Sequence, residues 1–290
     1  MAPRWSDVLT MARRAEEVGF DSLWLPDHLI VQWGWEGSQP EGVWELWSLL
    51  SALAASTERV ELGTLVACTA FRNPTLLAKM ADTVDEISGG RLILGIGAGW
   101  HEAEFRAFGY LFDRRVSRFA EAATIIHGLL KNGQIDFDGT YYQARDCELR
   151  PRGPRPEGPP IMIGGSGQRM LGLSARFADI WNRDFDVWNP DVTPYSDEDL
   201  RAWTPRVDAA CAAVGRDPAT LVRTAGVLVD LPIADPREGW QALNGTAEEI
   251  AAGLRAYARA GFTHAQVWLE PSSLAGVEAF GEVLEALDRG

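Results

Sequence analysis

The stretch from Arg91 to Gly99 restricts the possible folds of this chain more than any other part of its sequence. Arg91–Ile96 has the length and apolar density of a strand buried on both faces, and Ser88–Gly90 ends the preceding helix because glycine adopts positive φ without steric cost. Gly95, Gly97 and Gly99 then allow a flat ligand or another backbone to approach closely. Ligands of α/β folds bind at the carboxyl ends of strands, so we expect a cofactor site here. A strand that ends in a tight turn for packing alone is the alternative.

Two common nucleotide-binding motifs do not fit this glycine run. The dinucleotide-binding motif G-x-G-x-x-G requires a third glycine at the position of Trp100, and a P-loop requires a Gly-Lys-Ser/Thr sequence that the run lacks. The run is therefore neither a Rossmann fingerprint nor a Walker motif.

Helical and strand patterns alternate with short connections along the chain. The predicted helices are 5–18, 43–56, 74–87, 117–130, 170–177, 198–214, 247–260 and 276–287. The predicted strands are 22–25, 59–67, 91–96, 161–163, 179–181, 221–231 and 264–269. This order is typical of parallel βαβ units, and 290 residues suit a single (β/α)8 TIM-barrel domain over residues 1–290. A doubly wound open sheet is the structural alternative.

Two features modify the barrel prediction. Asp138-Gly139, flanked by Phe137 and by Tyr141-Tyr142, predicts a small hairpin insertion over residues 134–144. The sequence also opens on a helix and yields seven barrel strands, so the first strand is missing from the pattern. Either a strand precedes this start, or the barrel seam is filled in another way.

Charge and composition exclude several classes of partner. The net charge of −14 argues against nucleic acid or an anionic membrane, and no apolar run approaches the roughly 20 residues of a membrane span. The N-terminus lacks an apolar signal core, and Cys68, Cys147 and Cys211 are odd in number and widely spaced. We therefore expect a cytoplasmic protein without disulfides.

Several runs resemble the bacterial luciferase-like monooxygenase family, and most closely its branch that uses the deazaflavin F420. They are Leu62–Val66 (LGTLV), Arg72–Pro74 (RNP), Asp85–Gly109 (DEISGGRLILGIGAGWHEAEFRAFG), Ile163–Gly167 (IGGSG) and Ala178–Asn182 (ADIWN), together with Arg115, Arg118 and Pro159-Pro160. The resemblance extends from about Trp5 to Asn182, and more loosely to the C-terminus. The long glycine–tryptophan block is specific, whereas the Gly-Gly-Ser-Gly turn alone is weak.

The resemblance implies a TIM barrel with F420 at the carboxyl-end mouth, FMN being the alternative cofactor. It implies a non-proline cis peptide between Leu65 and Val66 behind the cofactor ring. Cys68 and Thr69 would line the ring edge, with Thr69 as hydrogen-bond donor, although a buried inert cysteine explains Cys68 equally well. The expected cofactor-binding residues are Leu65, Val66, Cys68, Thr69, Gly97, Ala98, Gly99, Gly164, Gly165, Ser166 and Gly167.

The turn Gly164–Gly167 opens a helix, so free N–H groups and the helix dipole suit a phosphate there. A plain turn is the alternative. Ser166 is not a nucleophile elbow, because G-x-S-x-G requires glycine where Gln168 stands.

Asp27 and His28 follow a predicted strand and are the candidate catalytic residues. Catalytic groups of barrels lie at strand carboxyl ends, and a histidine can give or take the proton that accompanies hydride transfer. In the F420 branch a similar Asp-His pair lies near the reactive face of the deazaflavin. A capping aspartate beside an incidental loop histidine is the alternative.

Trp24, Trp100 and His101 are the expected substrate-lining residues. Branch members that oxidise sugar phosphates carry a glutamate acid at the place of Trp100, so the substitution favours an apolar or aromatic substrate. No metal site is expected, because H-E-x-x-H would require histidine where Phe105 stands.

Arginines and tryptophans supply two further candidate surfaces. F420 carries a polyglutamate tail, for which Arg114, Arg115, Arg118 and the arginines of the loop 150–155 are candidates; solvated surface arginines are the alternative. Trp33 and Trp35 are candidates for an aromatic lid, whereas Trp44 and Trp47 have the spacing of helix core or interface.

These observations predict an F420-dependent oxidoreductase that transfers a hydride between deazaflavin and a small organic substrate. An FMN-dependent monooxygenase that uses reduced flavin and O2, with a flavin or F420 reductase as partner, is the close alternative. A non-catalytic flavin-binding protein is the alternative of another class. The chain is expected to form a homo-oligomer through the apolar faces of helices 43–56 and 74–87.

Overall fold

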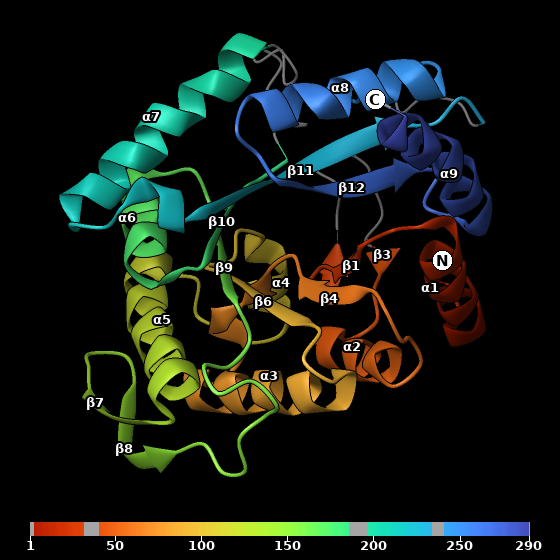
Figure 1. Cartoon of the computed structure of the whole chain (residues 1–290). Helices are drawn as coiled ribbons and strands as arrows, with labels where there is room; N and C mark the ends of the chain where they lie inside the picture. The colour runs from red at the N-terminus through yellow and green to blue at the C-terminus, as the bar shows by residue number, and fades with distance from the viewer. Residues whose placement is uncertain (1–2, 32–40, 186–196, 234–240, 290) are drawn as a thin grey trace. The chain divides into compact units, whose positions relative to one another are not determined.

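The computed structural model describes residues 3–31, 41–185, 197–233 and 241–289 (Figure 1). The chain divides into two compact units, one formed by Met1–Trp5 and Ser22–Ile163 and the other by Ser6–Asp21 and Gly164–Gly290. Each unit is described here by itself, and the single domain over residues 1–290 stays a prediction.

The first unit is built on four parallel strands that are neighbours in the order β1 (Ser22–Leu25), β4 (Glu61–Thr64), β6 (Leu92–Gly97) and β9 (Ile161–Gly164). All six residues of β6 are buried, as expected for a strand covered on both faces. A short strand, β5 (Ala67–Cys68), pairs with the end of β6. The predicted strand 59–67 is therefore in two parts, β4 and β5.

Between these two parts lies a cis peptide bond that joins Leu65 to Val66. It falls at the position that the family resemblance implied, so that expectation is confirmed. The Leu65 N–H donates to Leu25 O at 2.8 Å, which ties the end of β4 to the end of β1.

Four helices of the first unit are α2 (Leu46–Ala54), α3 (Pro74–Ser88), α4 (Glu102–Ala107) and α5 (Arg115–Asn132). Local sequence explains the bounds of α3: Asn73 caps its start by accepting from Thr75 N, Pro74 takes the first helical position, and Gly89 ends it with φ +68°. In Figure 1, α3 runs between α2 and α5 and packs against both. The short helix α4 was not predicted.

The predicted hairpin is present as β7 (Gln134–Asp138) and β8 (Gln143–Glu148), which pair antiparallel and extend four residues beyond the predicted end at 144. Glu121 of α5 holds the hairpin turn, because its carboxylate accepts from the N–H groups of Thr140, Tyr141 and Tyr142. A second, unpredicted pair consists of β2 (Ile30–Val31) and β3 (Glu41–Gly42).

The second unit contains three parallel strands in the order β10 (Ile180–Arg183), β11 (Val222–Asp230) and β12 (His264–Glu270). Its helices are α1 (Trp5–Val18, whose first residue belongs to the other unit), α6 (Gln168–Phe177), α7 (Asp197–Ala213), α8 (Ala247–Arg259) and α9 (Leu274–Asp288). β11 and β12 lie side by side, with α8 and α9 beside them (Figure 1).

The seven predicted barrel strands are thus all present, four in the first unit and three in the second. Among the helices of the described residues, none combines the length and the hydrophobicity needed to cross a bilayer.

Candidate active site

The loop that follows β1 holds both candidate catalytic residues, and Asp27 is fully engaged there. Its Oδ2 accepts from Arg72 Nη1 at 2.6 Å and from Cys68 N at 2.8 Å, while Oδ1 accepts from Arg72 Nη2 at 3.1 Å. Burial raises the pKa of the Asp27 carboxyl, although the bonds from Arg72 and Cys68 act against it. Both oxygens are committed to fixing the chain, so this geometry favours a positioning role over proton transfer.

Arg72 links several segments of this region through hydrogen bonds of its guanidinium group. Besides Asp27, it reaches Glu45, whose Oε1 lies 2.7 Å from Arg72 Nη2. Glu45 also caps the start of α2 by accepting from Trp47 N and Ser48 N. A buried arginine that holds two carboxylates therefore joins the loop after β1, the start of α2 and the segment before α3. The sequence analysis quoted Arg72 as part of a motif without giving it a role.

His28 is held by a residue that lies 76 positions away. Its Nδ1 is 3.0 Å from Oε1 of Glu104, and the other carboxylate oxygen of Glu104 accepts from Leu29 N at 2.9 Å. The Glu104 side chain is only 3% exposed, and that of His28 is 16% exposed. Because Glu104 offers two acceptors to two N–H groups, it orients the ring of His28 with Nδ1 as the donor, and in the neutral imidazole this leaves Nε2 as an acceptor.

Two further rings surround this pair. His101, which is buried, places Nδ1 3.9 Å from Oε1 of Glu104. The ring centroids of Trp100 lie 5.7 Å from those of His28 and 5.1 Å from those of His101, and Trp100 is 56% exposed. Thus His28, Trp100 and His101, predicted separately as catalytic and substrate residues, are brought together within the first unit.

Glu104 was missed by the sequence analysis, although it stood inside the quoted motif. Glu104 lies in the first turn of α4, three residues after His101. A carboxylate at that place is ordinarily explained by its favourable interaction with the helix dipole, so the sequence offers no reason to assign it to a site. The contact with His28 depends on tertiary structure and has no local signature.

Other atoms of the protein occupy the space beside the glycines of β6 and of the segment after it. A Cβ at Gly95 would lie 2.0 Å from Thr64 O, one at Gly97 would lie 2.5 Å from Val66 Cγ2, and one at Gly99 would lie 2.7 Å from Cys68 Sγ. The close approach predicted for these positions is therefore made by neighbouring protein atoms. Gly99 also has φ +76°, and its carbonyl accepts from Arg115 Nη1 at 2.5 Å.

Thr69 and Cys68 are both buried, at 2% and 4% exposure. The Thr69 hydroxyl donates to Gly97 O at 3.3 Å, so the donor that was predicted for the cofactor is used within the protein.

Trp24 has its Nε1 bonded to Ser22 Oγ at 2.7 Å, and its ring covers Gly63 of β4, its register partner. Trp24 therefore packs across β1 and β4.

Cys68 is expected to resist alkylation in the folded protein. Burial raises the pKa of its thiol to about 12, so about one thiol in ten thousand is ionised at pH 8. Iodoacetamide at pH 8, followed by peptide mass spectrometry, should label the partly exposed Cys147 and leave Cys68 unmodified. Denaturant serves as the control and should make all three cysteines react. Labelling of Cys68 at the rate of Cys147 would contradict the buried, inert thiol.

In the second unit, the turn Gly164–Gly167 leads into α6. Gly165 has φ +127°, and its carbonyl accepts from Trp181 Nε1 at 3.0 Å. Gly167 is the N-cap of α6 and has no side chain to cap the helix; within the described residues, no heavy atom lies within 4 Å of where its Cβ would be. No side chain of the N-cap residue competes for this end of α6, and a helix N-terminus of this kind suits an anion.

A cation that the sequence analysis missed lies beside this turn. Arg206 of α7 donates from Nη2 to Ser166 O at 3.1 Å, and its guanidinium stacks on Trp203 at 4.0 Å from the ring centroid. An arginine held beside a helix N-terminus reinforces the fit of this turn to a phosphate.

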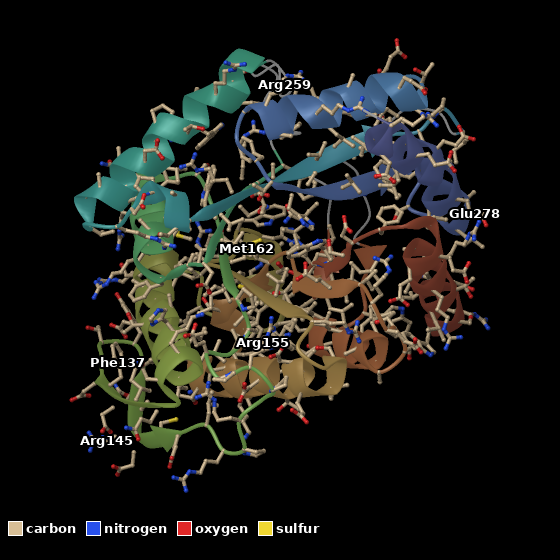
Figure 2. All side chains as sticks on the ribbon, viewed as in Figure 1. Phe137, Arg145, Arg155, Met162, Arg259 and Glu278 are labelled. Atoms are coloured by element: carbon tan, nitrogen blue, oxygen red, sulfur yellow. The ribbon has the colours of Figure 1, made fainter. Side chains whose placement is uncertain are left out.

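Arg155, in the loop 150–155, contacts the end of β6 that lies away from Gly97. Arg155, labelled beside α3 in Figure 2, bonds Asp85 of α3 and the carbonyl of Leu92, the first residue of β6. Gly97 is the last residue of the same strand, about 16 Å further along at about 3.3 Å per residue. Arg155 therefore binds at the opposite end of β6 from Gly97, and a role of the loop arginines in holding a polyglutamate tail stays a prediction.

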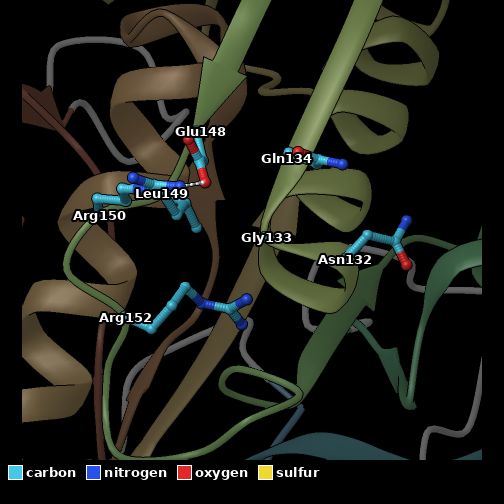
Figure 3. A pocket seen from close by; sticks show the side chains of 7 residues that line it. All are labelled: Asn132, Gly133, Gln134, Glu148, Leu149, Arg150 and Arg152. Carbon is cyan, nitrogen blue, oxygen red and sulfur yellow. Dashed lines mark ion pairs between the residues drawn. The ribbon is translucent and has the colours of Figure 1, made fainter.

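A shallow pocket of about 270 Å³ lies at the base of the hairpin, lined by Asn132–Gln134 and Glu148–Arg152 (Figure 3). Its arginines are already bonded: Arg150 pairs with Glu148 at 2.5 Å, and Arg152 Nη2 donates to the carbonyls of Leu130 and Pro156. Arg150 and Arg152 are among the candidates for the polyglutamate tail, whereas none of the predicted catalytic, cofactor-binding or substrate-lining residues lines this pocket.

The tryptophans divide into two groups. Trp47 is buried at 3% exposure in α2, as the helical spacing indicated, whereas Trp44 is 57% exposed just before that helix. Trp33 and Trp35 lie outside the described residues.

Comparison with solved structures identifies the fold. The chain superposes on the structure titled "F420-dependent secondary alcohol dehydrogenase in complex with an F420-acetone adduct" with a TM-score of 0.80, covering 98% of this chain and 96% of that one at 20% identity. At this identity the likeness shows the fold alone. The fold is a TIM-barrel-like α/β fold, as predicted.

Sequence comparison defines the family. The chain matches the luciferase-like monooxygenase family over residues 1–238, and it belongs to that family. It is 35% identical over 178 residues to an F420-dependent glucose-6-phosphate dehydrogenase of Amycolatopsis mediterranei (strain U-32), covering 60% of this chain and 51% of the relative. It is 29% identical over 248 residues to pyrimidine monooxygenase RutA of Caulobacter sp. (strain K31), covering 83% and 66%.

The chain spans about half the length of the first of these relatives and about two-thirds of the second. The predicted family is confirmed, and its members named here are oxidoreductases, one of them a monooxygenase. Localisation in the cytoplasm, a reductase partner and homo-oligomerisation stay predictions. Leu76 and Ile87 of α3, at 52% and 45% exposure, are available on one of the two helices proposed for self-association.

Proposed function

We propose that this chain is an F420-dependent oxidoreductase that transfers a hydride between deazaflavin and a small organic substrate. The observation that carries the proposal is the arrangement at the carboxyl ends of three adjacent strands, β1, β4 and β6. There the His28–Glu104 pair, the Leu65–Val66 peptide and the Gly97–Gly99 segment lie within one unit. Carboxyl ends of strands are where barrel enzymes build their active sites. The F420-dependent dehydrogenase among the relatives supports the choice of cofactor.

Each unit, taken by itself, contains residues that fit a part of such a cofactor. The N-terminus of α6, where the N-cap Gly167 has no side chain and Arg206 donates to Ser166 O, would take a phosphate. In the first unit, Leu65, Val66, Ala98 and the exposed Trp100 are candidates to contact the ring system. When bound, deazaflavin supplies the hydride chemistry at its C5, while the protein binds, orients and excludes water.

His28 would handle the proton that accompanies the hydride. Its Nδ1–H donates to Glu104, so Nε2 presents a lone pair that can accept the proton of a substrate hydroxyl, or return it in the reverse direction. Trp100, beside His28 and more than half exposed, offers an aromatic surface to the substrate. Asp27 would position this loop through Arg72 and Cys68.

Binding of F420 and FMN, titrated separately and followed by fluorescence, tests the proposal. We expect F420 to bind and Gly167→Asp to weaken it at least tenfold, because a carboxylate at the α6 N-cap repels a phosphate while remaining a good capping residue. Gly172→Asp is the matched control: it adds the same charge to the same helix at another open position. Binding of FMN alone would overturn the F420 assignment.

An FMN-dependent monooxygenase is the second candidate, favoured by the pyrimidine monooxygenase among the relatives, which covers 83% of this chain. That function predicts FMN binding, and O2 consumption when reduced FMN and substrate are supplied. If a cofactor binds and neither F420-linked hydride transfer nor O2 consumption occurs with any donor, the chain is a non-catalytic flavin-binding protein.

A further inference from the structure

We propose that His28, His101 and Glu104 form a binding site for a divalent transition-metal ion of the Zn²⁺ or Co²⁺ type. The ligand-capable atoms of these three side chains all lie within 4.8 Å of one another. They come from two elements, the loop after β1 and the start of α4, both in the first unit. The inference stands independently of the proposed function.

The spacing of the donor atoms suits a metal ion. Oε1 of Glu104 lies 3.0 Å from Nδ1 of His28 and 3.9 Å from Nδ1 of His101. Ligands bound at about 2.1 Å around a tetrahedral ion are about 3.4 Å apart, so the two observed distances lie on either side of the required value. The three side chains therefore offer donor atoms at separations close to those around a single ion.

His101 supplies the observation that points to a ligand. The residue is 9% exposed, and its buried Nδ1 has no hydrogen-bond partner among the described residues. A buried ring nitrogen without a partner carries an energetic cost that a metal ion would remove. This nitrogen faces the carboxylate oxygen that already holds His28.

The surroundings are those of a metal centre rather than of a surface cluster. Leu29 N donates to Oε2 of Glu104, which orients Oε1 toward both imidazoles and leaves one carboxylate oxygen as the ligand. Trp100 lies beside both histidine rings. Two imidazoles and one carboxylate favour Zn²⁺, Co²⁺ or Ni²⁺ over Mg²⁺ and Ca²⁺, which prefer oxygen ligands alone.

A bound metal would change what His28 can do. Coordination through Nδ1 displaces the hydrogen bond to Glu104 and moves the ring proton to Nε2. His28 then presents a donor where it otherwise presents an acceptor. The metal form and the proton-accepting form of His28 therefore exclude each other.

The experiment uses the full chain, stripped with a chelator and titrated with Co²⁺ in the absence of F420 and FMN. We expect one Co²⁺ per chain, visible absorption bands of a low-coordinate site, and their loss when Zn²⁺ is added. His101→Ala and Glu104→Gln should each weaken Co²⁺ binding about 100-fold. The control is His127→Gln, which removes another of the four histidines and should leave the bands and the affinity unchanged.

His101→Ala is the decisive variant, because no hydrogen bond of the described structure depends on its Nδ1. Its folding is verified by circular dichroism. If wild type and His101→Ala bind Co²⁺ equally, or if wild type gives no visible bands, the metal site is refuted. F420 titration of the same samples separates the two proposals: binding of F420 without Co²⁺ refutes only the metal site, and binding of Co²⁺ without F420 refutes only the cofactor assignment.

Discussion

Replacing Glu104 with glutamine is expected to lower kcat for F420-linked hydride transfer at least 100-fold while changing the Kd for F420 less than threefold. General acid–base catalysis contributes about 100- to 10,000-fold in enzymes, and here it depends on the ring of His28 being held with Nε2 unprotonated. The variant should therefore lose proton transfer by His28 and keep its affinity for F420.

The physical reason is that a glutamate side chain has two hydrogen-bond acceptor oxygens, whereas a glutamine side chain has one. His28 Nδ1–H and Leu29 N–H are both donors, and the two oxygens of Glu104 accept one bond from each. Glutamine has the same shape but a single acceptor oxygen. The backbone N–H of Leu29 cannot change, so the ring of His28 must present an unprotonated Nδ1 to the amide and carry its proton on Nε2. The variant keeps the contact and reverses the tautomer.

Steady-state kinetics with EDTA in every assay checks this prediction without interference from metal ions. His28→Asn is the comparison variant, and the double variant Glu104→Gln/His28→Asn should be no slower than His28→Asn alone, because Glu104 acts through His28. A fully additive loss, or a large rise in KM with kcat unchanged, would show that Glu104 supports the structure and does not position the proton.

The fold was accessible from sequence because its signals are local and periodic. Asn73-Pro74 begins α3 and Gly89 ends it, and the predicted start at residue 74 matches the structure. The buried run at Arg91–Ile96 likewise identified β6 to within one residue at each end. The short helix α4 was not predicted, because its six residues are too few to show a helical period in the sequence.

The candidate site was accessible only where a residue has a distinctive place in the chain. His28 follows a strand, and the glycine turn precedes α6, so both positions could be singled out. Glu104, Arg72 and Arg206 act through partners that are far away in sequence, such as the 76 positions between Glu104 and His28. Thr69 shows the converse: its hydroxyl was correctly identified as a donor, but the acceptor, Gly97 O, depends on packing.

Replacing Arg72 with methionine is expected to lower the free energy of unfolding by about 3–5 kcal/mol, the usual cost of removing one partner of a buried ion pair. The Asp27 side chain is fully buried and the Arg72 side chain is 11% exposed, so water cannot replace the lost guanidinium. Urea unfolding monitored by tryptophan fluorescence measures the change. Arg289→Met is the control, because its ion pair with Glu248 is exposed, and it should cost less than about 1 kcal/mol.

A double variant shows whether the lost stability comes from the ion pair with Asp27 or from the packing of the aliphatic part of the Arg72 side chain. In Asp27→Asn/Arg72→Met the buried charge is gone, while the asparagine carbonyl oxygen can still accept from Cys68 N. We therefore expect the double variant to be more stable than Arg72→Met alone, and the coupling energy between the two positions to be large. A double variant that is less stable than Arg72→Met would show that the cost arises from lost packing, or from the contact with Glu45, and that the carboxylate of Asp27 tolerates isolation.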